Sequence, residues 1–409
     1  MANKNNAIVG LDLGSTKTAA LVCKPNAEGK LEVAGLGVAE SRGWRKGMIV
    51  NLELTAAALK KAIEAAEEAA GISIDTAYVG VGGAHIKGVN SSGAVTLGRP
   101  AGATREVERE DMARVIQTAQ GISLPEDRQL VQVLPQKFLL DHQDGIRDPV
   151  GMTGTRLEVN VHLVTGSITA HQNVVTAVNH AGVEVQDTVY EPLASAEACL
   201  GTDERELGVA LVDIGGGTTD LIVYHAGVVK HSAVIPVGGE HFTNDVAVGL
   251  RTPIPIAEKL KKAWGEHDPD KLADTLLEVP SVGDRPARML TSATLSEIIE
   301  PRAAELLELV REELVRSGCA QQLGAGVVLT GGGAKLSGIA ALADPILRVP
   351  ARVATPSGIE AMGDMLPDPA FATVVGLVIY GYRTRLMRDA KEPQGLLGKL
   401  WNSMRGKTA

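Results

Sequence analysis

Two segments far apart in the chain share one uncommon pattern, and that pattern constrains the fold more than any other feature. Residues 7–22, AIVGLDLGSTKTAALV, and residues 211–224, LVDIGGGTTDLIVY, each run from an apolar strand through Asp and Gly into a small polar turn and a second apolar strand. Glycine is unfavourable inside strands, so both segments are typical of β-hairpins whose tips need a bare backbone. The match of Asp12-Leu13-Gly14 to Asp213-Ile214-Gly215 predicts an internally duplicated chain.

A third glycine turn, GVVLTGGGAKLSG at residues 326–338, follows an apolar strand and is expected to open a helix through IAALADPIL. A single turn of this kind is usually a tight connection without a ligand. Three related turns favour a phosphate site, because small turn residues leave backbone N–H groups free to bind phosphate oxygens. A carboxylate beside phosphates repels them unless it faces a hydrated Mg²⁺, so Asp12 and Asp213 predict such an ion between two halves of the chain.

The amino-acid composition and charge argue against several classes of function. The 409 residues are 44% apolar and 22% charged, which is typical of a folded α/β protein with more than one domain. A net charge of -9 gives little support to a nucleic-acid partner. The three cysteines form no CxxC pair, so we expect a reducing compartment and no disulfide framework or zinc site. We expect neither a secretory nor a transmembrane segment.

The glycine turns resemble the two phosphate motifs and the adenosine motif of the superfamily of actin, sugar kinases and heat-shock-chaperone ATPases. Residues 189–200 and 371–381 resemble its two connecting motifs. Longer segments are similar to the FtsA family of bacterial cell-division proteins: GGAHIKGVNSSGAV, DGIRDPVGMTGTRLEV, GGEHFTNDVAVGLRTPIPIAEKLK and SVGDRPARML. The resemblance implies an α/β, actin-like two-lobed ATPase fold of duplicated ribonuclease-H-like domains, with an inserted subdomain and a C-terminal amphipathic helix.

The resemblance also implies a domain division. The expected parts are a first-lobe core at 1–83 and 159–194, an inserted subdomain at 84–158, a second-lobe core at 195–228 and 306–388, an outer subdomain of that lobe at 229–305, a linker at 389–395 and a membrane-targeting helix at 396–406.

Local patterns agree with the insertion. Residues 104–120 have helical spacing, residues 130–140 and 155–164 are typical of strands, and residues 141–154 form a polar segment expected to be a loop.

By resemblance, Asp12 and Asp213 orient Mg²⁺ through water, and Glu191 orients the attacking water. Thr218 is expected to add its hydroxyl to the phosphate site and is a second catalytic candidate. Glu191 has an ordinary alternative, a carboxylate favouring a positive helix N-terminus. Glu258 and Lys261 are three residues apart and face either one ligand or only each other. The remaining expected nucleotide-binding residues are Gly14, Ser15, Thr16, Lys17, Gly215, Gly216, Gly217, Gly238, Gly239, Gly331, Gly332, Gly333 and Lys335. For Lys17 a solvated position at a strand end is an equal alternative.

The C-terminal segment PQGLLGKLWNSMRGKTA predicts an amphipathic helix. At 100° per residue, Leu396, Leu397, Leu400, Trp401 and Met404 fall on one arc, with Lys399 and Arg405 outside it. A packed terminal helix has the same pattern. The preceding polar stretch RDAKEPQ, the basic flank and the interfacial tryptophan favour a membrane anchor, which the family resemblance also implies.

The expected function is therefore an actin-like cell-division protein that binds ATP and Mg²⁺, with slow or incidental hydrolysis. It polymerises on the cytoplasmic face of the bacterial inner membrane at the division site, binds anionic lipid, anchors the FtsZ ring and recruits later divisome proteins. Arg285, Arg288 and Arg302 are the candidates to meet acidic groups of the FtsZ C-terminal peptide, although solvated surface charge is the ordinary interpretation of each. The alternatives are a small-molecule, sugar-type kinase and an actin-like pilus-assembly adaptor.

Overall fold

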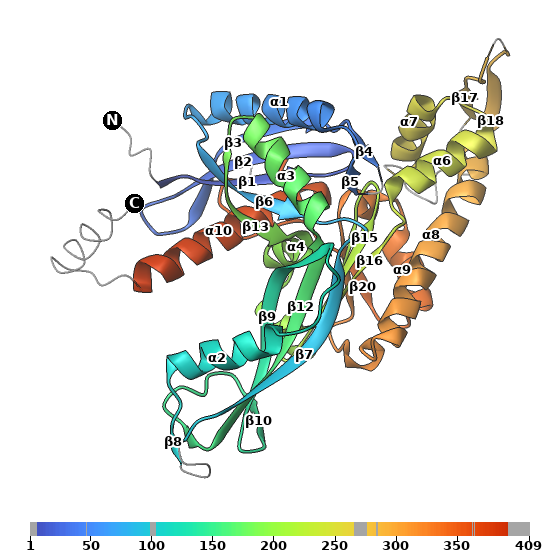
Figure 1. Cartoon of the computed structure of the whole chain (residues 1–409). Coiled ribbons are helices and arrows are strands. Elements are labelled where there is room, and N and C mark those ends of the chain that lie inside the picture. Colours follow the sequence, from blue (N-terminus) through green and yellow to red (C-terminus); the bar gives the residue numbers. More distant parts are fainter. Residues whose placement is uncertain are drawn as a thin grey trace.

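The computed structural model describes residues 6–45, 47–98, 104–265, 276–283, 285–361, 363 and 365–391. Two lobes, each centred on a five-stranded sheet, form the body, and a third part projects away from them (Figure 1).

The first-lobe sheet has the order β13-β6-β1-β2-β3. β1 pairs with β2 in antiparallel fashion and with β6 in parallel fashion. Its strands are β1 (Ile8–Leu13), β2 (Lys17–Pro25), β3 (Leu31–Glu40), β6 (Thr76–Val81) and β13 (Glu184–Tyr190).

The second-lobe sheet repeats this topology in the order β16-β15-β14-β19-β20, with β14 antiparallel to β15 and parallel to β19. Its strands are β14 (Val209–Ile214), β15 (Thr219–His225), β16 (Val228–Ile235), β19 (Val327–Thr330) and β20 (Ala351–Val353). Each predicted hairpin therefore opens one of two equivalent sheets. The predicted duplication is confirmed at the level of strand order and direction.

Helices complete both lobes. α1 (Leu52–Ala70) packs on β2 and β3 beside α3 (Ile168–His180), and α10 (Ala372–Lys391) packs on β1, β2 and β6. In the second lobe, α8 (Ser292–Arg316) packs against α9 (Ile339–Leu347), and α6 (Gly239–Leu250) lies against α7 (Ile254–Gly265). The smaller elements of the lobes are β4 (Trp44–Arg45), β5 (Met48–Ile49), α4 (Glu191–Cys199), α5 (Thr202–Leu207), β17 (Leu276–Val279), β18 (Arg288–Thr291), η3 (Ala320–Gln322), η4 (Gly332–Lys335) and η5 (Pro369–Phe371).

Helix α1 shows how local sequence sets this packing. The Asn51 side chain caps its start by accepting a hydrogen bond from Leu54 N, and Gly71 ends it in the left-handed conformation. Its buried residues recur every three or four positions. Opposite them, a Cβ on Gly37 would lie 1.9 Å from the Ala62 carbonyl oxygen, so glycine in β3 permits the close approach of the helix.

The chain crosses between the lobes at two helices. α4 follows β13 of the first sheet and leads through α5 to β14 of the second, whereas α10 follows the second-lobe residues and packs on the first sheet. The two helices pack on each other. A Cβ on Gly376 would lie 1.7 Å from the Ala194 carbonyl oxygen, so the two backbones meet at this point.

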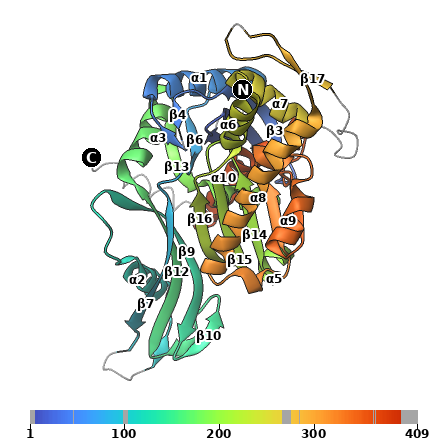
Figure 2. The same ribbon diagram turned by 90° about the vertical axis from the view of Figure 1, so that its right-hand side faces the viewer.

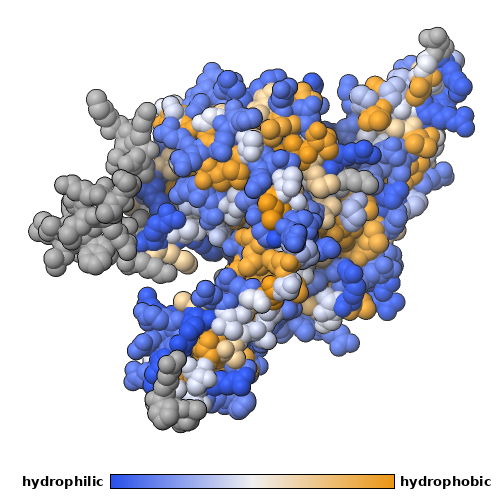
Figure 3. Space-filling model, viewed as in Figure 1, coloured by the Kyte–Doolittle hydropathy of each residue, from blue (hydrophilic) through white to orange (hydrophobic). Residues whose placement is uncertain are grey.

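The inserted subdomain is the part that projects from the body (Figures 1 and 2). Its four-stranded sheet has the order β10-β9-β12-β7, and α2 packs on β7 and β12. Its elements are β7 (Lys87–Thr96), β8 (Arg105–Glu106), α2 (Arg109–Gln120), β9 (Arg128–Leu140), β10 (Gln143–Ile146), β11 (Thr153–Gly154) and β12 (Arg156–Ser167). Apolar residues gather at its base, and most of its far end is hydrophilic (Figure 3).

Two local predictions need correction here. The helix expected at 104–120 begins only at Arg109, because β8 precedes it and the Asp111 carboxylate accepts a hydrogen bond from Glu108 N at the helix start. The expected loop at 141–154 contains β10 and β11, which pair with β9 and β8.

Two of the proposed domain boundaries, at 228 and at 305, fall where the structure has a continuous sheet or helix. β16 begins at Val228 and hydrogen bonds to β15, so the second-lobe sheet continues past the proposed limit at 228. α8 continues through 305 and 306 as one helix. The linker and tail proposed at 389–406 lie, from residue 392 onward, outside the described residues. Within the described residues, no helix is both long enough and apolar enough to cross a membrane.

A polar network around the buried His162 joins the inserted subdomain to the second lobe. His162 of β12 contacts Asn90 Oδ1 through Nδ1 and Ser232 Oγ through Nε2, both at 2.7 Å. The Asn90 amide nitrogen donates to the Lys230 carbonyl, so its oxygen is the acceptor and His162 carries its proton on Nδ1. Gln136 donates to the Val229 carbonyl at 2.7 Å. The insertion, whose chain ends both join the first lobe, is thus hydrogen bonded to β16 of the second.

Burial, reinforced by His231, lowers the pKa of His162 from 6.5 to about 4. As the pH falls, His162 is protonated near pH 6.5 in the unfolded chain but only near pH 4 in the folded protein. Protonation between these values therefore favours the unfolded chain, and the stability present above pH 6.5 is lost between pH 6.5 and 4. We expect a loss on the order of 3 kcal/mol in the free energy of unfolding across that window. Urea unfolding at several pH values measures this loss. It should be absent in His162→Gln and present in His180→Gln, a control at an exposed position. Identical pH profiles for wild type and His162→Gln would contradict the assignment.

Candidate functional site

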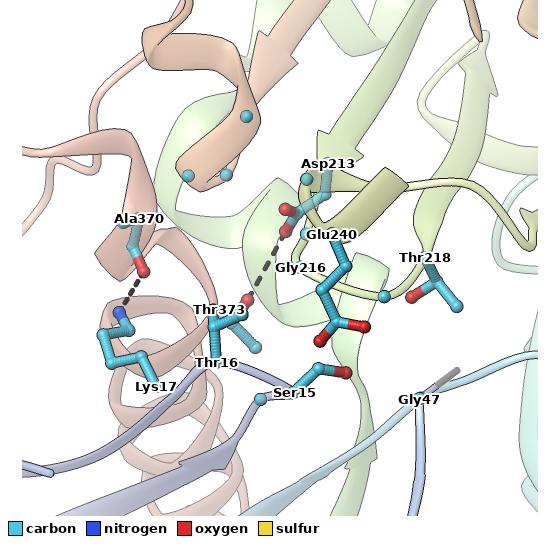
Figure 4. A pocket seen from close by; sticks show the side chains of 18 of the residues that line it. Ser15, Thr16, Lys17, Gly47, Asp213, Gly216, Thr218, Glu240, Ala370 and Thr373 are labelled. Atoms are coloured by element: carbon cyan, nitrogen blue, oxygen red, sulfur yellow. Dashed lines mark hydrogen bonds between the residues drawn. The ribbon is translucent and has the colours of Figure 1, made fainter. Parts of the chain in front are cut away.

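A cavity of about 460 Å³ lies between the lobes, at the tips of the two hairpins (Figure 4). Its lining comes from segments that are distant in sequence: the turns after β1 and β14, the turn after β19, the start of α6, and α7. Almost all of the residues predicted from sequence to bind nucleotide or metal line this one cavity: Asp12, Gly14, Ser15, Thr16, Lys17, Glu191, Asp213, Gly215, Gly216, Gly217, Thr218, Gly239, Glu258, Lys261, Gly331, Gly332, Gly333 and Lys335.

The two hairpin tips have matching geometry. Gly14 N donates to Lys17 O at 3.0 Å, and Gly215 N donates to Thr218 O at 2.9 Å. The tips also touch, since a Cβ on Gly216 would lie 2.6 Å from Cγ2 of Thr16. Glycine at 216 therefore sets the separation of the two turns across the cleft.

Gly238 and Gly239 were expected to offer amides to a ligand, and the structure uses both amides internally. Gly239 N donates to Gly215 O at 2.9 Å, and Gly238 N donates to Nδ1 of His241 at 3.1 Å. Their backbone supports the second-lobe turn. A Cβ on Gly238 would lie 2.8 Å from three backbone atoms of that turn.

Carboxylates from both lobes line this cavity, among them Asp12, Asp213 and Glu191. Burial raises the pKa of Asp12 to about 6, opposed by Lys17 and reinforced by Asp213. Burial also raises the pKa of Asp213, which the Ser195 hydroxyl lowers in part. The pKa of Glu191 is held well above its usual range by burial, with Asp12 next in effect. Such a cluster is costly in an empty protein and is typical of a functional site.

Glu191 lies at the start of α4, followed by Pro192. A Cβ on Gly82 would lie 2.1 Å from Glu191 Oε2, so the carboxylate rests directly on the backbone just after β6. Glu191 therefore both starts the helix and lines the cavity, a position compatible with either interpretation.

Asp220 is a cavity residue that the sequence analysis missed. It faces Asp213 in the register of β14 and β15, at the position where the first hairpin has Ala19 opposite Asp12. Burial, with Asp213 next, raises the pKa of Asp220 to about 8, and its Oδ1 has no hydrogen-bond partner within the described residues. The Thr218 hydroxyl donates to Asp220 Oδ2 at 3.3 Å. The signal in the sequence was the second aspartate of DIGGGTTD.

Glu240, at the first turn of α6, was also not predicted. Its side chain extends between the two hairpin tips near Ser15 (Figure 4). Burial raises its pKa.

The donor set fits a hydrated hard cation. Asp12 and Asp213 provide carboxylate oxygens from opposite lobes, the ligand type that Mg²⁺ prefers. The described part of the chain holds no group of three or more metal-ligating side chains, so waters and ligand oxygens would complete the coordination.

The lysines of the site have protein partners. Lys17 donates to the Ala370 carbonyl (Figure 4). Its ammonium lies 3.7 Å from the centre of the Phe371 ring. Burial lowers its pKa. Lys335 pairs with Asp368 at 2.5 Å.

Glu258 and Lys261 form an ion pair at 2.6 Å, and both line the cavity beside Thr243. The two alternatives left open by the sequence are compatible, since the residues face each other and the cleft.

The three arginines predicted to meet a partner lie away from the cavity, in the outer part of the second lobe. Arg285 is exposed, Arg288 donates to the Leu250 carbonyl, and Arg302 pairs with Asp245 and Glu305. The predicted membrane-binding residues at 396–405 lie outside the described residues.

Comparison with known proteins assigns the whole arrangement to one family. Residues 210–376 match the family profile described as cell division protein FtsA, and residues 83–165 match that of the SHS2 domain inserted in FtsA. The chain is 44% identical over 376 residues to cell division protein FtsA of Pseudomonas aeruginosa, covering 91% of this chain and 89% of that protein.

Solved structures with the same fold are more distant in sequence. The PilM-PilN type IV pilus biogenesis complex contains a chain with a TM-score of 0.66 and 18% identity, covering 92% of this chain and 98% of that one. MreB5 of Spiroplasma citri bound to ADP has a TM-score of 0.59 and 15% identity, covering 95% and 99%. These likenesses confirm the two-lobed, actin-like fold.

The carboxylate cluster predicts a stability effect without ligand. Because the folded-state pKa of Asp220 is raised from 3.8 to about 8, its contribution to stability is lost as the pH rises from about 4 to 8. Asp220→Asn should therefore raise the free energy of unfolding at pH 8 by more than about 1 kcal/mol, with little change at pH 4. Urea unfolding of nucleotide-free protein measures this, with the exposed Asp75→Asn as control. A destabilised Asp220→Asn protein at pH 8 would refute the stated origin of the shift.

Proposed function

Because this chain belongs to the FtsA family of cell division proteins, we propose that it is the ATP-binding, actin-like adaptor that tethers the FtsZ ring to the cytoplasmic membrane. The observation that carries the proposal is the convergence of two equivalent hairpin tips and their aspartates on one interlobe cavity, in a chain 44% identical to a cell division protein over most of its length.

The cavity supports nucleotide binding through its backbone. Ser15 and Thr16 in one tip and Gly216 and Gly217 in the other present a short, bare backbone toward the same space. The turn at Gly331–Gly333 passes on the nucleoside side, with Glu258 and Lys261 as the polar pair for the ribose and base. MreB5, which shares the fold, is described as bound to ADP.

Mg²⁺, when bound, neutralises phosphate charge and relieves the repulsion among the buried carboxylates. Asp12 and Asp213 would accept hydrogen bonds from its waters. Glu191 and Asp220 line the same cavity and are suited to hold a water, and a bound cation would favour the ionised carboxylate, the form that accepts a proton. We expect hydrolysis to be slow, because Lys17 and Lys335 are already paired within the protein.

The C-terminal segment supports reversible membrane attachment. Five apolar side chains provide on the order of 5 to 8 kcal/mol gross when partly buried, at roughly 1.5 to 3 kcal/mol each for full burial. Ordering about ten residues costs roughly 1 to 2 kcal/mol each, so attraction of basic residues to anionic lipid, about 1 kcal/mol each, decides the balance. Residues 383–409 carry seven basic and two acidic side chains. Polymerisation would make these weak anchors firm by linking many of them.

The outer part of the second lobe supports the FtsZ peptide site. Val282 and Met289 are exposed there to 57% and 59%, beside Arg285 and Arg288. Acidic groups of the FtsZ C-terminal peptide would complement the two arginines, and the exposed apolar side chains would contact any apolar residues beside those groups. Arg302 is the weaker candidate, because Asp245 and Glu305 already pair with it.

Nucleotide binding is tested by calorimetry. We expect MgATP to bind the wild-type protein and Gly216→Val to weaken binding by at least tenfold, since its side chain would occupy the space of Thr16 between the hairpin tips. Gly201→Val, at a glycine with an extended backbone (φ -73°, ψ 161°) and a nearest contact of 3.6 Å to a new Cβ, is a control away from the cavity lining. Absence of any MgATP signal in the wild type would remove the basis of the proposed cleft function.

The adaptor role is tested by co-sedimentation with vesicles containing anionic phospholipid. FtsZ should sediment only when the protein is present, and deleting residues 391–409 should abolish sedimentation of both. Trp401→Glu should act like the deletion, and Ser403→Glu, with the same added charge on the predicted polar face, should weaken binding far less. Unchanged sedimentation of the deletion at moderate salt would reject the anchor.

A further inference from the structure

Two hydroxyl groups hold the Asp213 carboxylate from the first-lobe side of the cleft. Ser195 Oγ donates to Asp213 Oδ2 at 2.7 Å, and Thr373 Oγ1 donates to the same oxygen at 3.4 Å. The two hydroxyls are 3.0 Å apart, so the single proton of Thr373 has two acceptors within reach, Asp213 Oδ2 and Ser195 Oγ. Figure 4 shows the Thr373 side chain directed at Asp213.

These hydroxyls come from the two helices through which the chain crosses between the lobes. Ser195 is on α4 and is fully buried, and Thr373 is in the first turn of α10. Gly376, one turn after Thr373, packs against the carbonyl of Ala194, the residue before Ser195. The closest contact of the two crossings therefore lies beside the hydroxyl pair and fixes the distance between its members.

The other carboxylate oxygen is also confined. A Cβ on Gly331 would lie 2.2 Å from Asp213 Oδ1, and Gly331 has a φ of +81°, which favours glycine. Asp213 Oδ1 thus faces the bare turn after β19, while Oδ2 faces the crossing helices. With both oxygens located, the carboxylate has one orientation about its last torsion.

The equivalent aspartate in the first lobe lacks this arrangement. Within the described part of the chain, Asp12 receives no side-chain hydrogen bond. Its strand partner is Ala19, and Lys17 acts on it only through charge. The two aspartates share a place in the duplicated fold but differ in how firmly they are held.

We propose that Ser195 and Thr373 are positioning residues, which hold Asp213 in the orientation that receives the magnesium ion of the nucleotide and tie that carboxylate to both chain crossings. The inference rests on the proposed nucleotide site and goes beyond it. A hydrogen bond to a carboxylate is stronger than one between neutral groups, and a fixed ligand pays no reorientation cost when the ion binds. Both hydroxyls should therefore act on the magnesium-dependent part of nucleotide affinity.

The test measures ADP affinity by calorimetry, once with Mg²⁺ and once with EDTA. For the wild type we expect tighter binding with Mg²⁺. Ser195→Ala should reduce that advantage by about tenfold, as expected for loss of a hydrogen bond to a charged group. Thr373→Val, which keeps the shape and removes the hydroxyl, should reduce it by about threefold, given the longer contact. Thr373→Ser, which keeps the hydroxyl, should restore the wild-type ratio. Affinity in EDTA should stay within about twofold in all variants.

The outcomes separate this inference from the proposed function. If a variant loses ADP affinity equally with Mg²⁺ and with EDTA, its hydroxyl has a structural role and the inference is overturned. The inference is also overturned if Ser195→Ala and Thr373→Val keep the wild-type ratio of the two affinities. A wild type that binds no nucleotide under either condition would overturn both the inference and the proposed nucleotide site. If Ser195→Ala does not fold, the comparison of Thr373→Val with Thr373→Ser decides alone, because Thr373 is only half-buried.

Discussion

The electrostatic cost of gathering four carboxylates between two lobes is the constraint on which the rest of this structure depends. Asp12, Asp213, Asp220 and Glu191 all line one cavity, and burial raises the pKa of each. Hydrophobic packing alone would not select such an arrangement, because a buried carboxylate without a partner opposes folding. A bound cation and the phosphates it accompanies would relieve this cost. The carboxylate cluster therefore lowers the stability of the empty protein and favours binding of the cation.

The carboxylate cluster lies beside the segments that connect the two lobes. α4 and α10 carry the chain across the cleft and meet at Gly376, beside the hydroxyls that contact Asp213. The inserted subdomain leaves the first lobe yet hydrogen bonds to β16 of the second through His162, Asn90 and Gln136. A change in the angle between the lobes would therefore strain two sets of contacts, one inside the cleft and one at the base of the insertion.

Much of the site could be predicted from sequence, for identifiable reasons. Glycine, serine and threonine in a turn between apolar strands have few local alternatives, so both hairpins and the turn at Gly331 were predicted correctly. Glu191 was predicted from its position before Pro192 in a connecting motif. Asp220 was missed, because alternation within a strand gives no sign that its inner face meets a second carboxylate. The internal use of the Gly238 and Gly239 amides depends on contact with the turn at Gly215, which is distant in sequence.

The sequence by itself determined the duplicated hairpins, the family, and the residue types of the turns that line the cavity, because these follow from local backbone chemistry and short-range periodicity. Only the tertiary structure decided that Asp220 and Glu240 join the cavity, that Lys17 and Arg302 are already paired, and that Ser195 and Thr373 hold Asp213. These facts depend on contacts between segments far apart in the chain. Such contacts are set by packing around glycines such as Gly376, whose role becomes evident only when the opposing backbone is in place.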